Sequence, residues 1–201
     1  MSTPEKRNLE GLLNPESLDV AQRLLFIGLS ESDFVQASTA AKTALALVGD
    51  PTWEPCPTYL ALSEAALIRY SRPFMGNRMP GTKKKAALPL SYLPFEIDGA
   101  EAFHQAAMAI RHQFGAHSDM TKRDLWLEKL LAPEFGVVWR GHALCVWLKP
   151  PDLFGLHRLA NAMASALRQE LSMLAEEAFP GIPGGAKLHV STTSRTSART
   201  F

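Results

Sequence analysis

The sequence predicts a mainly α-helical fold, a bundle of about five helices with one small β-hairpin. Three observations lead to this class. Apolar residues recur at helical spacing in most segments between residues 17 and 179. Prolines and glycines stand at the ends of these segments, where they stop helices. Residues 135–148 are instead rich in β-branched and aromatic residues, which favours a hairpin there.

In the N-terminal part, the sequence predicts a flexible segment followed by two helices. Residues 1–15 are polar and include two prolines, so we expect no fixed structure there. Ser17 is placed to cap a first helix that ends near Gly28. The run of Ser, Glu, Ser and Asp at 30–33 predicts a new helix start, and the Gly-Asp-Pro at 49–51 ends that second helix.

The middle of the chain predicts two helices separated by a long loop. A third helix covers 58–71 and stops before Pro73, because proline disfavours helical backbone at the residue that precedes it. Residues 75–97 are predicted to form a loop, and loops of this length are usually functional or mobile. A helix over 101–119 follows, and it ends or bends near Gly115.

The segment after this helix predicts a short helix and then the hairpin. Thr121 is placed to cap a helical piece that runs to Leu131. Residues 135–148 divide around Arg140 and Gly141 into two β-rich runs, so we expect the turn of the hairpin at these two residues.

The C-terminal part predicts the longest helix. Asp152 is placed to cap it, apolar residues recur at helical spacing through 152–179, and Pro180 stops it. The tail 183–201 is rich in Ser, Thr and Gly, so we expect disorder, with a short strand near 188–190 as the alternative. Residues 16–182 are therefore predicted to form one helical domain.

Composition limits the class of protein. The chain has 201 residues with a net charge of +1, and its hydrophobic fraction of 46% is ordinary for a globular protein. Its two cysteines form no CxxC pair, which fits a reducing compartment. We see neither a secretory signal nor an apolar stretch that could cross a bilayer. We therefore expect a cytoplasmic protein with no membrane partner.

Charge is distributed unevenly along the chain. Between Glu64 and Glu96 there is no acidic residue, but there are six basic ones: Arg69, Arg72, Arg78, Lys83, Lys84 and Lys85. This stretch favours a binding surface for a polyanion, most simply RNA. The alternative is a solvated loop that serves solubility.

Arg111 and His117, at the end of the 101–119 helix, suit the cleavage of a phosphodiester. Histidine can transfer protons near neutral pH, and arginine can pair with phosphate oxygens through its planar fork. In RNA, the 2′-hydroxyl attacks the adjacent phosphate, so the reaction needs no metal or cofactor. His112 and His117 lack the spacing of a zinc-binding H-E-x-x-H pair, and the sequence has no P-loop or Rossmann glycine motif.

The chemistry of these two residues predicts a dimer. Positions six apart on a helix are rotated by roughly 120° and separated by about 9 Å. Arg111 and His117 therefore converge only through the reach of the arginine, a bend at Gly115 or a second subunit. One histidine cannot easily act as base and acid in the same step, so we expect a homodimer through the 101–119 helix.

The segment R-H-Q-F-G-A-H, near the end of a helix in an all-α domain, resembles the R-x4–6-H motif of the HEPN superfamily. That resemblance implies a metal-independent, dimeric endoribonuclease of phage defence or toxin–antitoxin systems, with an antitoxin as a possible partner. It also implies that Arg111 and His117 are catalytic, with His112 as a supporting polar residue. The resemblance covers roughly residues 55–120, and the hairpin is not part of a minimal HEPN bundle.

We assign the substrate-binding role to one aromatic and several basic residues. Tyr70 lies in a Y-S-R-P-F segment that is similar to one in HEPN-like bacterial proteins, and the others belong to the acid-free stretch. The set is Tyr70, Arg69, Arg72, Arg78, Lys83, Lys84 and Lys85.

Each of these assignments has a structural alternative. His117 can be a partly buried histidine, and Arg111 can pair with Glu101, Asp119 or Asp124. Tyr70 can belong to the core, and Arg72 can cap a helix. The whole domain can be a non-catalytic module for dimerisation or partner binding.

Overall fold

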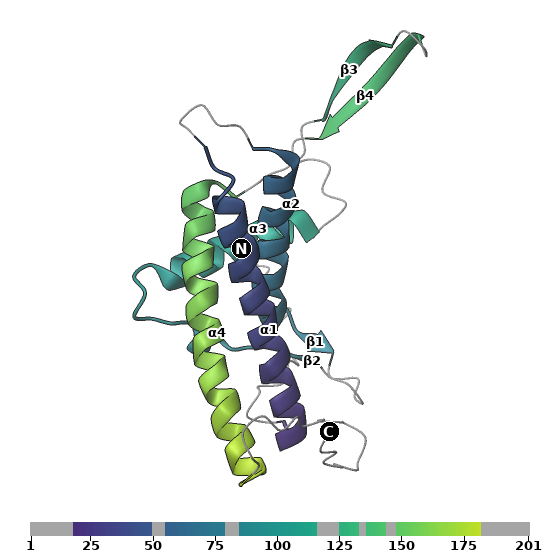
Figure 1. Cartoon of the computed structure of the whole chain (residues 1–201). Helices are drawn as coiled ribbons and strands as arrows, with labels where there is room; N and C mark the ends of the chain where they lie inside the picture. The colour runs from purple at the N-terminus through teal and green to yellow at the C-terminus, as the bar shows by residue number, and fades with distance from the viewer. Residues whose placement is uncertain are drawn as a thin grey trace, which may run out of the picture.

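A mainly helical fold with a small hairpin is confirmed by the computed structural model (Figure 1). The structure describes residues 18–49, 55–78, 85–115, 125–132, 136–143 and 148–181. Four α-helices run through these residues. None of them is long and apolar enough to cross a bilayer. The predictions for 1–15 and 183–201 concern residues outside the described ranges.

The first helix, α1 (Val20–Leu45), replaces the two helices that were predicted between 17 and 48. Its N-cap is Asp19, whose carboxylate accepts a hydrogen bond from the backbone N–H of Gln22 at 2.8 Å. The predicted helix start at 30–33 is wrong, because Glu31 and Asp33 make contacts between helices instead of a cap. Glu31 binds Arg168 of the last helix, and Asp33 binds Arg69 and Arg72, which follow later in the chain.

The last helix, α4 (Pro150–Ala178), lies antiparallel beside α1 along most of its length (Figure 1). The N-cap is Lys149, not the predicted Asp152. Two prolines occupy the first positions, where the missing N–H costs nothing, and Asp152 lies in the first turn. A carboxylate there still favours the helix, because it faces the positive end of the helix dipole.

The second helix, α2 (Pro57–Ser71), confirms the predicted helix over 58–71. Cys56 is its N-cap, and the short 3-10 helix η3 (Arg72–Phe74) continues it. The helix ends where Pro73 was expected to end it.

The predicted loop at 75–97 contains short elements in its described part. They are the paired strands β1 (Asn77–Arg78) and β2 (Lys85–Ala86) and the 3-10 helix η4 (Leu90–Tyr92). The backbone N–H of Leu88 donates to the carbonyl of Pro73 at 2.9 Å. This bond holds the segment after β2 beside the end of α2.

The hairpin consists of β3 (Leu125–Ala132) and β4 (Gly136–Ala143), which pair antiparallel. The predicted helix from Thr121 to Leu131 is wrong where the structure describes it, since Leu125–Leu131 form a strand. Arg140 and Gly141 lie within β4, opposite Glu128 and Leu127, so the predicted turn position is also wrong. Strand pairing overrides the moderate helix propensity of the leucines here.

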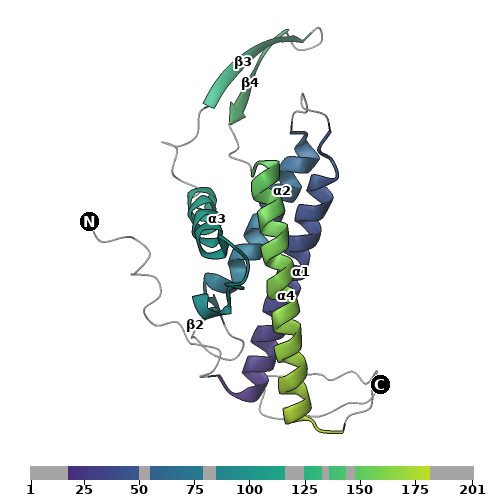
Figure 2. The ribbon, with the colours of Figure 1, turned by 90° about the vertical axis from the view of Figure 1, so that its left-hand side faces the viewer.

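The third helix, α3 (Ala100–Gly115), crosses the other three helices instead of running along them (Figures 1 and 2). It confirms the predicted helix up to Gly115. Its inner face carries the buried residues His104, Ala107 and Met108.

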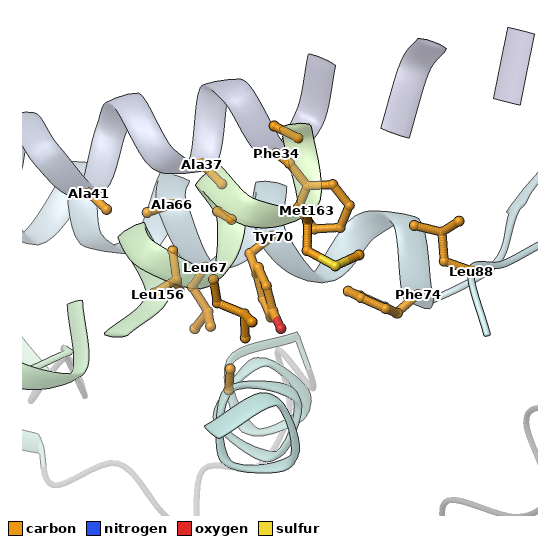
Figure 3. Packing of buried hydrophobic residues seen from close by; sticks show 14 of the residues in the cluster. Phe34, Ala37, Ala41, Ala66, Leu67, Tyr70, Phe74, Leu88, Leu156 and Met163 are labelled. Carbon is orange, nitrogen blue, oxygen red and sulfur yellow. The ribbon is translucent and has the colours of Figure 1, made fainter. Parts of the chain in front are cut away.

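The core lies between α1, α2 and α4, and α3 covers one side of it. Figure 3 shows part of this packing, in which Tyr70 of α2 lies among Phe34, Phe74 and Met163. Tyr59 adds a polar tie, because its buried hydroxyl donates to the carbonyl of Leu148 at 2.7 Å. Near the other end of α2, Tyr70 contacts Phe34 of α1 and His104 of α3, so it links these three helices.

Candidate functional site

The structure describes the first part of the Arg-x5-His motif. Arg111 and His112 lie in the last two turns of α3, and His117 lies outside the described residues. Arg111 is half-buried, and His112 is exposed. The motif thus begins on regular helix, near the C-terminal end of α3.

The guanidinium of Arg111 has one unsatisfied donor. Its Nε is buried and has no hydrogen-bond partner in the part of the chain that the structure describes. Glu101, one of the partners considered above, lies ten residues away on the same helix, about 15 Å along its axis, and accepts a hydrogen bond from Gln105. A buried N–H without a partner costs about 1–3 kcal/mol, so an incoming acceptor would bind favourably here.

Arg111 shares a face of α3 with His104 and Met108. Residues three, four and seven apart return to nearly the same side of a helix. His104 and Met108 are buried, so this face points into the bundle, and Arg111 follows at its outer end. The opposite face carries the exposed residues Ala102, Ala106 and Ala109, and the exposed Gln105 and His112 lie at the border between the two faces.

His104 is bound to Tyr70 inside the bundle. The Tyr70 hydroxyl and Nδ1 of His104 lie 2.9 Å apart, and both side chains are buried. Burial lowers the pKa of His104 to about 4 and raises the pKa of Tyr70. Both groups are therefore neutral at pH 7, so the phenol donates to Nδ1 and the imidazole proton sits on Nε2.

An aromatic cluster surrounds this hydrogen bond. Phe74 contacts the His104 ring with a centroid distance of 4.4 Å, and Phe34 contacts Tyr70 at 5.8 Å. Tyr70 was predicted to contact the substrate, but its side chain is 0% exposed in this structure. The tyrosine belongs to the core, since its hydroxyl finds its partner on α3 and not in solvent.

Arg69 and Arg72 both bind Asp33. Nη1 of Arg69 lies 2.9 Å from Oδ1 of Asp33, and Nη1 of Arg72 lies 3.2 Å from the same oxygen. The Asp33 side chain is only 9% exposed, whereas those of the arginines are 36% and 43% exposed. The two arginines thus meet at one buried carboxylate of α1. Tyr70, which lies between them in the sequence, points instead to His104 of α3.

The other basic residues of the acid-free stretch are partly described. Lys85 is exposed and pairs through its backbone with Arg78 in the β1–β2 ladder. Lys83 and Lys84 lie outside the described residues. The ladder follows η3 directly, so it brings two further basic positions close in sequence and space to the end of α2.

Asp33 and His104 were not identified from the sequence. Asp33 was predicted as part of a helix start. The seven-residue spacing between His104 and Arg111 places both on one face of the helix, but it does not identify Tyr70 as the partner of His104. The partner of Asp33 could not be found that way, since it lies on another helix.

The remaining polar groups give no metal centre. Among the described residues, no group of three or more His, Cys, Asp or Glu side chains is placed to hold an ion. Comparison with known proteins adds no assignment, because no family model, curated protein or solved structure matches this chain significantly.

Proposed function

We propose that this protein is a metal-independent endoribonuclease of HEPN type, active as a homodimer. The observation that carries the proposal is the state of Arg111. Its guanidinium lies half-buried at the end of α3, with a buried Nε that has no hydrogen-bond partner among the described residues. A phosphate oxygen suits such a donor, because guanidinium and phosphate can pair through parallel hydrogen bonds.

The proposed reaction needs one proton acceptor and one proton donor. A neutral His117 takes the proton of the 2′-hydroxyl, and the 2′-oxygen then attacks phosphorus. The bond from phosphorus to the 5′-oxygen breaks, and a protonated His117 of the second subunit gives its proton to that oxygen. The products carry a 2′,3′-cyclic phosphate and a 5′-hydroxyl. Arg111 balances the charge that builds up on the phosphate oxygens.

His104 does not take either proton-transfer role. Its pKa of about 4 keeps it uncharged at pH 7, and its Nδ1 is engaged by Tyr70 in the core. Its part in the site is to fix α3 against α2, which sets the position of Arg111 two turns further along the helix. His112 is exposed beside Arg111 and stands as the supporting polar residue of the motif.

The position of Arg111 supports a site completed by a second subunit. The residue belongs to the end of α3, where it is half-buried while the preceding residues of its face are buried. A twin subunit that meets this end of α3 would supply the second histidine. Basic residues of the acid-free stretch, including Arg69, Arg72 and Lys85, attract the RNA.

The resemblance places this activity in phage defence or in a toxin–antitoxin pair, with an antitoxin protein as the partner that restrains it. Product analysis tests the chemistry. We expect fragments with 5′-hydroxyl and 2′,3′-cyclic phosphate ends, formed by a species of twice the subunit mass. Fragments with 5′-phosphate ends would contradict attack by the 2′-hydroxyl.

A second candidate function is partner binding without catalysis. The outer face of α3 favours it, because Ala102, Ala106 and Ala109 form an exposed stripe of small residues that lets another helix approach closely. The Ala106→Glu variant separates the candidates. The glutamate would abolish association through the alanine face. If the variant still formed a dimer through another surface and still cleaved RNA, the nuclease would be favoured.

A further inference from the structure

Asp33 holds two arginines although one would balance its charge. Both Nη1 atoms share its Oδ1, at 2.9 Å for Arg69 and 3.2 Å for Arg72. The carboxylate is buried inside the packing of α1 against α2, so a cationic partner is required there. The second arginine exceeds that requirement and leaves the cluster with one net positive charge.

The two guanidinium groups keep most of their donors for another acceptor. Each guanidinium has five N–H groups, and within the described part of the chain each uses one nitrogen in its bond to Asp33. Their side chains are 36% and 43% exposed, so the remaining edges reach solvent. The shared oxygen fixes their inner ends, which reduces the side-chain freedom that a ligand would have to restrict.

The surroundings of this pair carry no compensating charge from its own segment. From residue 65 to residue 95 the chain has no Asp or Glu. The bond from Leu88 to Pro73 and the β1–β2 ladder bring Lys85 and the backbone of Arg78 to the end of α2 that carries Arg72. The local field therefore favours an anion.

We propose that Arg69 and Arg72, oriented by Asp33, form a binding site for a phosphodiester group of single-stranded RNA. Two adjacent guanidinium edges can hold two oxygens of one phosphate, or one oxygen of each of two neighbouring phosphates. Asp33 acts as a positioning residue, because it contacts the arginines and not the ligand.

This site holds a different phosphate from the one that is cut. Tyr70 stands between the two arginines in sequence and points to His104 on α3, whereas the arginines point to α1. Arg111 lies a further seven residues along α3, about 10 Å from His104 along the axis. The Arg69–Arg72 pair is thereby assigned to substrate binding. Its link to RNA cleavage rests on the proposed function.

Binding is measured separately from cleavage. The His117→Ala protein is titrated with a fluorescent 20-nucleotide single-stranded RNA at several KCl concentrations, with and without Arg69→Gln or Arg72→Gln. Each single variant leaves one arginine to balance Asp33, so the fold is preserved. Each lost phosphate contact should reduce the slope of log K against log salt by about 0.7. We expect affinity to fall about fivefold or more at low salt.

Arg168→Gln is the matched control. Arg168 also pairs with a carboxylate of α1, Glu31, and its side chain is 64% exposed, but it lies on α4. This variant removes the same charge and the same kind of ion pair. If Arg69→Gln and Arg72→Gln change the salt slope no more than Arg168→Gln does, the site is excluded.

Asp33→Asn keeps an acceptor oxygen for the arginines and removes the charge that competes with phosphate, so we expect RNA binding to be tighter by a few-fold, together with a lower melting temperature. Asp33→Ala also removes the acceptor oxygen, so a folded Asp33→Ala protein should bind RNA more weakly than Asp33→Asn does. Equal binding by the two variants would overturn the positioning role of Asp33. If the wild-type protein binds RNA through this pair and does not cut it, this site remains in place and the proposed nuclease is contradicted instead.

Discussion

The hydroxyl of Tyr70 and Nδ1 of His104 lie 2.9 Å apart in the core, and this hydrogen bond joins α2 to α3. The same helix, α3, carries Arg111 two turns further on. The bond therefore connects the packing of the bundle to the position of the candidate catalytic arginine. It also explains why a polar pair persists among the aromatic side chains of the core.

Tyr70→Phe removes this bond and leaves Nδ1 of His104 without its buried donor. We expect a loss of about 1–3 kcal/mol in the free energy of unfolding, measured with urea. Tyr92→Phe is the control, since the Tyr92 hydroxyl donates to Glu170 at a half-buried position that water can reach. Equal losses in the two variants would contradict a special role for the buried pair.

His104 makes stability depend on pH. Its folded pKa of about 4 lies below its ordinary value of 6.5, because burial disfavours the charged ring. The unfolded chain therefore binds the proton more readily, and stability that is complete above pH 6.5 is lost as pH falls towards 4. The full effect is about 3 kcal/mol.

The pH measurement compares the wild type with His104→Gln between pH 4.5 and 7.5. We expect the wild type to lose stability across this window, and the variant to be less stable at pH 7 but to show a flatter profile. Parallel profiles would assign the pH dependence to other groups.

Two glycines of the long helices should respond oppositely to alanine. A Cβ on Gly155 of α4 would lie 2.7 Å from Cε2 of Phe103, whereas a Cβ on Gly28 of α1 would meet Leu171 at an ordinary 3.8 Å. Alanine stabilises the interior of a helix by about 1 kcal/mol relative to glycine. We expect Gly28→Ala to raise the melting temperature.

Gly155→Ala should lower the melting temperature, because displacing α3 through Phe103 costs about 1–3 kcal/mol. Stabilisation by both substitutions would mean that the Phe103 ring moves aside freely. We also expect the Gly155→Ala protein to cleave RNA more slowly, because a displaced α3 would shift Arg111.

Arg111→Ala should abolish RNA cleavage while the fold persists. The residue is half-buried and its buried Nε has no partner among the described residues, so its removal leaves no carboxylate of that set unpaired. We expect a loss of activity of at least 100-fold with a change in melting temperature of only a few degrees. Arg158→Ala, an exposed arginine of α4, serves as the control and should retain activity.

A large fall in the melting temperature of Arg111→Ala would show that the arginine is structural. Arg111→Lys refines the result, because lysine keeps the charge but lacks the fork that pairs with phosphate. We expect Arg111→Lys to remain folded and nearly inactive.

The helices of this fold could largely be predicted from the sequence, because their apolar spacing and their proline stops are local signals. The break at 30–33 was predicted wrongly for a physical reason. Ser, Glu and Asp mark helix starts when their side chains turn back to the backbone, but Glu31 and Asp33 turn to arginines of other helices. Such partners are distant in the sequence, and no local pattern announces them.

The same limit applies to the candidate site and to the hairpin. The Arg-x5-His spacing identifies Arg111, but the burial of Tyr70 depends on α3 crossing α2, which spacing does not specify. Leu125–Ala132 has the leucines of a helix and becomes a strand because Gly136–Ala143 pairs with it. Tertiary contacts decide both cases.

The most direct test of the central claim is RNA cleavage by the purified protein in EDTA, compared with His117→Ala. The account predicts that the wild type cleaves RNA undiminished in EDTA and that the His117→Ala protein, folded with an unchanged melting temperature, does not. Cleavage retained by His117→Ala, or lost by the wild type in EDTA, would contradict it.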